Sequence, residues 1–137
     1  MAAALFILYV ADQDAARRFY AQVLDREPQL DVPGMTEFAL AAEAVLGLMP
    51  AAGVRRLLGP TLPDPAAAAG APRAELYLRV ADAAAHHARA LAAGARELSA
   101  LAARDWGERV AYSLDPDGHV LAFAEAVSPL PSQEPRA

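Results

Sequence analysis

The feature that most constrains the fold of this chain is a segment that occurs twice. Residues 5–12 read LFILYVAD, and residues 75–82, seventy positions later, read ELYLRVAD. In both copies a strand-like run of about six residues ends in Val-Ala-Asp, so Asp12 and Asp82 are predicted helix N-caps. A duplicated strand–helix start indicates that the chain contains two copies of one supersecondary unit.

The residues after each Asp indicate a helix, more clearly in the first copy. Arg17 and Arg18 face outward there, and an apolar stripe follows the spacing i, i+3, i+4, i+7, i+8, at Ala16, Phe19, Tyr20, Val23 and Leu24. The second helix is predicted over 83–93, with Gly94 as its stop. Its alanine-rich sequence favours three inward residues, Ala84, Ala88 and Leu91.

Three short strands are predicted after each helix, near 29–32, 37–41 and 44–49, and again near 96–99, 108–114 and 119–125. Asp115-Pro116-Asp117-Gly118 predicts a hairpin turn before the last strand. We therefore expect an α+β fold in which two βαβββ modules in tandem form a cup-shaped mixed sheet with helices outside. The modules cover about 4–49 and 74–125 of a single domain, residues 1–127.

A Pro- and Ala-rich loop at 50–73 joins the modules, and 128–137, with three prolines, is predicted to be a flexible tail. A segment this long without periodicity is either a linker or a functional loop. Arg55 and Arg56, which lie in it, either are solvated charges or close on an anionic ligand.

Composition excludes several classes of function. The 12 basic and 17 acidic residues give a net charge of −5 and form no basic run, which argues against nucleic-acid and anionic-membrane partners. The absence of cysteine excludes disulfides, thiolate metal sites and cysteine nucleophiles. The apolar start lacks a basic flank and a cleavage site, so it is interpreted as a strand and the protein is expected in the cytoplasm.

The doubled module resembles the vicinal oxygen chelate superfamily, which includes glyoxalase I, bleomycin-resistance proteins, fosfomycin-inactivating enzymes and extradiol dioxygenases. The likeness covers about 4–125 and rests on Val-Ala-Asp, on Phe19-Tyr20 and on the turn at 115–118. It implies that paired modules enclose a ligand cavity, either within one chain or swapped between chains. It also implies a symmetric homodimer, which would cover the strand edges.

The resemblance also implies where a metal would lie. Metal-dependent members carry ligands at positions that correspond here to Leu5, Gly47, Glu75 and Ala122. Three of these four lack a donor side chain, whereas a divalent metal needs at least three protein ligands. No metal and no other cofactor is therefore expected.

The three histidines do not suggest a replacement site. His86 and His87 are adjacent on a helix, about 100° apart, and are interpreted as surface residues that cannot converge on one ion. His119 follows the turn and is interpreted as a rim or turn-stabilising residue.

Strand alternation separates the side chains into two faces. The uniformly apolar set is expected to face the helices: Phe6, Leu8, Val10, Leu76, Leu78 and Val80. The last strands are expected to line the cup with Val45, Gly47, Met49, Val120, Ala122 and Ala124. With Trp106 on a loop above, the predicted ligand-binding residues are Tyr9, Glu75, Tyr77, Arg79 and Trp106.

Purely structural roles also remain open for these residues. Arg79 can reach solvent, Glu75 can pair with another Arg, and Trp106 can pack in a core or an interface.

The favoured function is binding, without a metal, of a small and partly aromatic organic molecule, as in bleomycin-resistance proteins. The first alternative is an enzyme, a metal-dependent or metal-independent lyase or dioxygenase. No catalytic residue is assigned, and Glu75 is the candidate general base. The second alternative is a structural or regulatory domain whose own side chains fill the cup.

Overall fold

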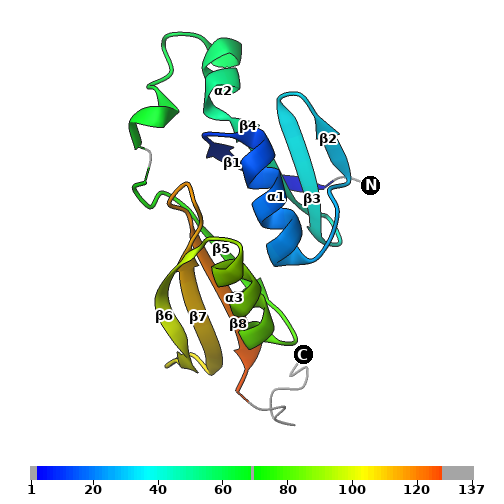
Figure 1. The fold of residues 1–137 in the computed structure, drawn as a ribbon, viewed down its shortest axis with the longest axis vertical. Helices are drawn as coiled ribbons and strands as arrows, with labels where there is room; N and C mark the ends of the chain where they lie inside the picture. The colour runs from blue at the N-terminus through cyan, green and yellow to red at the C-terminus, as the bar shows by residue number, and fades with distance from the viewer. Residues whose placement is uncertain (1–2, 69, 128–137) are drawn as a thin grey trace.

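The structure, a computed structural model, describes residues 3–68 and 70–127. The tail predicted at 128–137 lies outside the described residues. The first module contains β1 (Ala4–Val10), α1 (Gln13–Leu24), β2 (Leu30–Val32), β3 (Met35–Ala41) and β4 (Ala44–Pro50). The second contains β5 (Glu75–Arg79), α3 (Ala83–Ala92), β6 (Arg96–Ala103), β7 (Glu108–Leu114) and β8 (Val120–Ala126). The predicted α+β fold of two βαβββ modules is confirmed (Figure 1).

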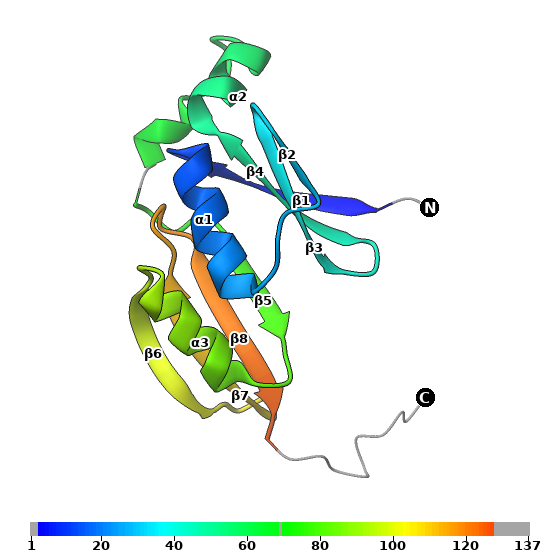
Figure 2. The ribbon, with the colours of Figure 1, turned by 45° about the vertical axis from the view of Figure 1, so that its right-hand side comes forward.

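Each module forms its own mixed four-stranded sheet, with the order β1-β4-β3-β2 in the first and β5-β8-β7-β6 in the second. The first strand of each module pairs in parallel with the fourth, and the other pairings are antiparallel. As a result β1 and β5 are both edge strands. Helices α1 and α3 pack against each other, and both views show them side by side (Figures 1 and 2).

The two predicted helix caps are present. One carboxylate oxygen of Asp12 accepts from the backbone N–H of Ala15, and the equivalent oxygen of Asp82 accepts from Ala85, each at 3.0 Å. The predicted apolar stripe of α1 is buried: Ala16, Phe19, Tyr20, Val23 and Leu24.

The predicted phase of α3 is wrong by one residue. The buried residues are Ala83, His87 and Ala90, and the expected inward Ala84 and Ala88 are exposed. The surface assignment of His87 is wrong for the same reason, since its Nε2 lies 2.9 Å from Glu97 on β6. An alanine-rich helix offers little hydrophobic contrast between its faces, so its sequence does not determine which face is buried.

The connection at 50–73 contains regular structure that the sequence did not reveal. It includes α2 (Ala51–Leu58) and a short 3₁₀ helix, η1 (Pro65–Ala68). Val54 is the only buried residue of α2, so this helix has no apolar stripe from which to predict it. Gly59, with φ of 85°, ends α2 in a conformation that few other residues adopt.

One hydrophobic core joins the helix-facing sides of both sheets. The predicted strand phase agrees with this core, because Leu8 and Val10 are buried in it and Leu76, Leu78 and Val80 pack against it. Phe6 is the exception and remains 62% exposed. Within the described residues no helix is long and apolar enough to cross a membrane.

The turn at 115–118 fastens the second module to the first. The hydroxyl of Tyr20 on α1 donates to Oδ2 of buried Asp115 at 2.5 Å. The Asp115 Oδ1 atom accepts from the backbone N–H groups of Asp117 and His119, at 2.9 and 2.8 Å. The backbone N–H of Ala11 donates to Oδ1 of Asp117 at 2.9 Å.

The environment of His119 therefore differs from the one predicted. Its backbone stabilises the turn, as expected, but its ring is buried and does not lie at an open rim. The Nε2 atom lies 3.2 Å from the carbonyl oxygen of Tyr9, so the ring bridges the two modules.

Candidate functional site

The side of the second sheet that faces away from the helices carries an aromatic cluster over small residues. Tyr77 on β5, Ala122 on β8 and Tyr112 on β7 are direct neighbours in one row across the sheet. The two tyrosines pack over Val110, Ala122 and Ala124, which are fully buried as a consequence. We call these five residues the aromatic face; it combines exposed ring edges with an apolar floor.

A hydrogen-bond network crosses one end of the aromatic face. The Tyr77 hydroxyl donates to Oε1 of Glu108, and it accepts from the indole N–H of Trp106 at 2.9 Å. The Nε of Arg79 donates to Glu108 Oε2 at 2.7 Å. The Arg79 guanidinium also lies 5.6 Å from the centroid of the Tyr77 ring. Glu108 on β7 thereby binds two side chains of β5, those of Tyr77 and Arg79, and Trp106 joins the network through the Tyr77 hydroxyl.

The electrostatics of the network keep Glu108 ionised. The hydrogen bond from Arg79, followed by that from Tyr77, holds the pKa of Glu108 below its usual value. Loss of hydration at Tyr77, together with its bond to Glu108, raises the pKa of the phenol. The group therefore contains a carboxylate, a guanidinium and a neutral phenol at neutral pH. Such a set can orient a ligand, and it holds no unpaired base.

The structure brings together three of the five predicted ligand-binding residues, Tyr77, Arg79 and Trp106. Glu75 shares the Tyr77 side of β5 but takes part in no hydrogen bond of this network, and its exposure at the start of the strand means that it lacks the enclosure that the general-base hypothesis assumed. Tyr9 is half-buried on β1 and takes part in the module junction through its carbonyl oxygen.

Glu108 is the site residue that sequence reasoning missed. It lies two positions before Val110 and four before Tyr112, so strand alternation places it on the same face. The alternation of side chains along β7 is therefore the sequence signal that indicates Glu108.

Glu75 contributes to a second feature, an apolar groove of about 500 Å³ between the edges of β1 and β5. Its lining is mainly apolar: Leu5, Phe6, Ile7, Leu8, Leu46, Ala74, Leu76 and Tyr77, with Glu75 as the charged member. The two sheets are thus separated along these edges and do not form one continuous sheet.

The residues at the positions implied for a metal do not fit one. Leu5, Gly47 and Ala122 offer no donor atom, and Glu75 alone does. A Cβ at Gly47 would overlap the Ile7 side chain and come within 3.4 Å of the Met35 sulfur, so the space for a ligand side chain is filled. Within residues 3–68 and 70–127 no three His, Asp or Glu side chains gather as a metal site.

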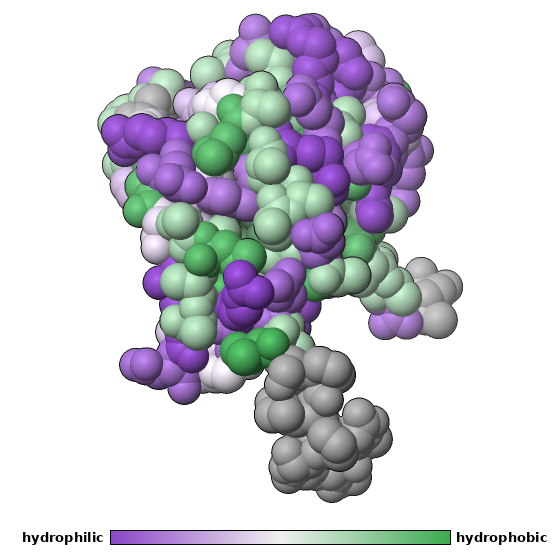
Figure 3. Space-filling model, turned by 60° about the horizontal axis from the view of Figure 1, so that its bottom comes forward, coloured by the Kyte–Doolittle hydropathy of each residue, from purple (hydrophilic) through white to green (hydrophobic). Residues whose placement is uncertain are grey.

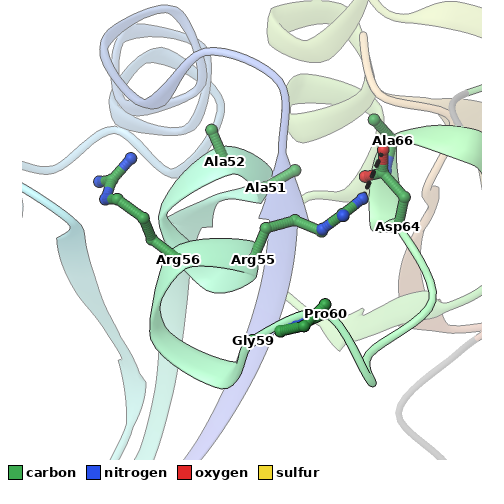
Figure 4. Close-up of a pocket in the computed structure, with 8 residues that line it drawn as sticks. All are labelled: Ala51, Ala52, Arg55, Arg56, Gly59, Pro60, Asp64 and Ala66. Carbon is green, nitrogen blue, oxygen red and sulfur yellow. Dashed lines mark hydrogen bonds and ion pairs between the residues drawn. The ribbon is translucent and has the colours of Figure 1, made fainter.

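A larger hollow, of about 610 Å³, lies between α2 and the segment leading to η1 (Figure 4). Arg55 spans it and pairs with Asp64 at 2.9 Å, whereas Arg56 points away from that pair (Figure 4). Arg55 is therefore held by a carboxylate of the connection itself, and the two arginines do not converge on one point.

The surface seen from the end of the second module alternates between polar and apolar residues (Figure 3). No continuous apolar face is visible from this side, so the exposed apolar residues have to be judged one by one.

Two βαβββ modules in one chain, each with its own mixed four-stranded sheet, define a protein of the vicinal oxygen chelate type. The family model described as "Glyoxalase-like domain" matches residues 5–124. The chain therefore belongs to the glyoxalase-like domain family. A search of curated protein sequences gave no significant match.

Solved structures support the same fold. A glyoxalase-related enzyme from Fulvimarina pelagi superposes with a TM-score of 0.75 at 24% identity, covering 89% of this chain and 86% of that one. A glyoxalase/bleomycin resistance protein/dioxygenase from Nocardioides gives 0.73 at 20% identity, covering 97% and 89%. A glyoxalase/bleomycin resistance protein from Catenulispora acidiphila gives 0.65 at 24% identity, covering 92% and 99%. At these identities the likeness concerns the fold alone.

Proposed function

We propose that this protein binds a small, partly aromatic organic molecule at the aromatic face, without a metal, and that binding rather than catalysis is its role. The observation that carries the proposal is the network in which Glu108 binds Tyr77 and Arg79, and the Tyr77 hydroxyl binds Trp106, beside an apolar floor. Aromatic and apolar surface with a few oriented polar groups is what small organic ligands select.

A homodimer is part of the proposal. Strand β1 has no charged residue and an unpaired edge, and two of its residues, Leu5 and Phe6, are 41% and 62% exposed. Long apolar edges invite pairing with other chains unless they are covered. A second copy seated on the groove between β1 and β5 would cover both edges and would enclose the ligand further.

The experiment is a titration with benzyl alcohol as a neutral aromatic probe, followed by the fluorescence of Trp106, the only tryptophan. Tyr77→Ala should weaken probe binding by about 1–3 kcal/mol, the usual range for a buried aromatic anchor. Leu57→Ala, which truncates an exposed apolar residue on α2, is the matched control and should leave binding unchanged. Equal affinities of Tyr77→Ala and the parent protein would contradict the proposal.

One alternative also has an observation in its favour. Val110, Ala122 and Ala124 are fully buried under the chain's own tyrosines, as expected for a structural or regulatory domain whose face is already filled. Under this reading benzyl alcohol causes no saturable change in Trp106 fluorescence at any concentration the protein tolerates. The same titration therefore separates the two functions.

A further inference from the structure

The aromatic face is bordered by a second arginine with an unusual set of partners. Arg104, in the loop between β6 and β7, lies with its guanidinium 5.2 Å from the centroid of the Tyr112 ring. Its Nη2 donates to the carbonyl of Val110 at 2.7 Å and to the Ser99 hydroxyl at 2.8 Å. It also lies 3.2 Å from the carbonyl of Ala100, and Nε lies 3.3 Å from that of Val110.

All of these acceptors are neutral. Arg104 takes part in none of the ion pairs within residues 3–68 and 70–127. The closest acidic member of the network, Glu108, is already committed to Arg79 and Tyr77. Among the described residues the Arg104 guanidinium is thus held in place without an acidic partner, and Nη1 takes part in none of its hydrogen bonds.

A guanidinium whose Nε and Nη2 atoms are held by the protein, and whose Nη1 atom is available, can bind a planar anion. Carboxylates bind such a group through strong charge-assisted hydrogen bonds, and the neighbouring tyrosine rings offer aromatic surface to the rest of the same molecule. On the other side of the floor Arg79 lies over Tyr77. Because Glu108 neutralises Arg79, Arg104 is the charge that would make the site prefer an anionic ligand over a neutral one.

We propose that the ligand of the aromatic face is a small aromatic carboxylate, with its ring against Tyr77 and Tyr112 and its carboxylate on Arg104. This inference rests on the proposed function, since it names the class of molecule that the same face takes. It adds a specificity-determining residue, Arg104, that neither the strand alternation nor the family likeness indicated.

The test compares three probes on the full-length protein by Trp106 fluorescence: benzoate, benzyl alcohol and acetate. Benzoate should bind at least about 10-fold more tightly than either benzyl alcohol, which lacks the charge, or acetate, which lacks the ring. Arg104→Gln should weaken benzoate binding about 10- to 100-fold, the range for loss of a charged hydrogen bond, and should weaken benzyl alcohol binding much less, because that probe has no charge for Arg104 to bind. Arg56→Gln, which removes an exposed arginine beside the α2 hollow, is the matched control.

Arg104 also braces its own hairpin, so Arg104→Lys serves as a second variant that keeps the charge. It should bind benzoate with intermediate affinity, because a lysine retains attraction without the planar fork. If benzyl alcohol binds as tightly as benzoate, or if Arg104→Gln binds benzoate as the parent does, the inference fails while the proposed function stands. If none of the three probes binds, both fail.

Discussion

Removing one hydroxyl from the module junction should destabilise the whole protein. Tyr20→Phe deletes the donor to Oδ2 of Asp115 and keeps the shape of a ring that is 1% exposed. Asp115 retains the two backbone N–H groups on Oδ1, so the turn itself should survive. The variant thus isolates a single bond between α1 of the first module and the last hairpin of the second.

The expected loss follows from the burial of the acceptor. Asp115 is 4% exposed, so water does not replace the missing donor freely. Hydrogen bonds to charged groups contribute about 1.5–3 kcal/mol to folding, and we expect a loss of this size. For a chain of this length that corresponds to a fall in Tm of roughly 6–12 °C.

Urea unfolding followed by far-ultraviolet circular dichroism measures this loss as a shift in midpoint at constant slope. Tyr9→Phe is the matched control, since the Tyr9 hydroxyl takes part in no hydrogen bond among the described residues and the same atom is deleted. A free energy of unfolding for Tyr20→Phe within about 0.5 kcal/mol of the Tyr9→Phe value would refute the reasoning, because ordinary surface substitutions fall in that range.

Three other expectations can be measured directly. Burial first, and then the charge of Asp115, raise the pKa of Tyr20 well above 10.0, so its contribution to stability is complete below pH 10 and is lost as the pH rises through the folded value. Urea midpoints of the parent should therefore fall on the alkaline side, and those of Tyr20→Phe should not show this component. The hydrogen bond from Arg79 lowers the pKa of Glu108, so the network is intact above about pH 4.5 and is lost as the pH falls through the lowered value. Trp106 fluorescence should report this acid transition, and Glu108→Gln should abolish it. Elemental analysis of protein purified without chelator should find no stoichiometric Zn, Ni, Fe or Mn; about one metal per chain that disappears in Glu75→Ala would contradict the donor argument.

The sequence allowed the fold to be predicted where physical contrast was strong. The stripe of α1 sets large apolar residues against arginines, and β5 alternates Glu75, Tyr77 and Arg79 with apolar residues, so both predictions held. Strand β1 is apolar on both faces, and there Phe6 departs from the predicted phase. The contrast fails in α3, where alanine occupies both faces, and in α2, where one valine is buried. Without a difference in hydrophobicity between faces, periodicity carries no information.

The site was predictable in part for a related reason. Alternation placed Tyr77 and Arg79 on one face, but the network depends on Glu108 from another strand and on the loop that carries Trp106. Which loop approaches which strand is decided by the pairing of β7 with β8 and by the length of the hairpin. Alternation along β7 is enough to place Glu108 on the aromatic face, but its bonds to Tyr77 and Arg79 depend on the strand order, which a linear sequence does not display.

The contact between Tyr20 and Asp115 has a consequence for the history of the duplication. Seventy positions after Tyr20 the second module has Ala90, and the turn between β3 and β4 reads Ala41-Ala42-Glu43-Ala44, without the aspartate-proline pair. The bond therefore runs in one direction only, from the first half to the second. Two copies of the second module would bring Ala90 to Asp115 and leave a buried carboxylate oxygen without its donor. Each half supplies a group that the other half lacks, so the two halves of the duplication are no longer interchangeable.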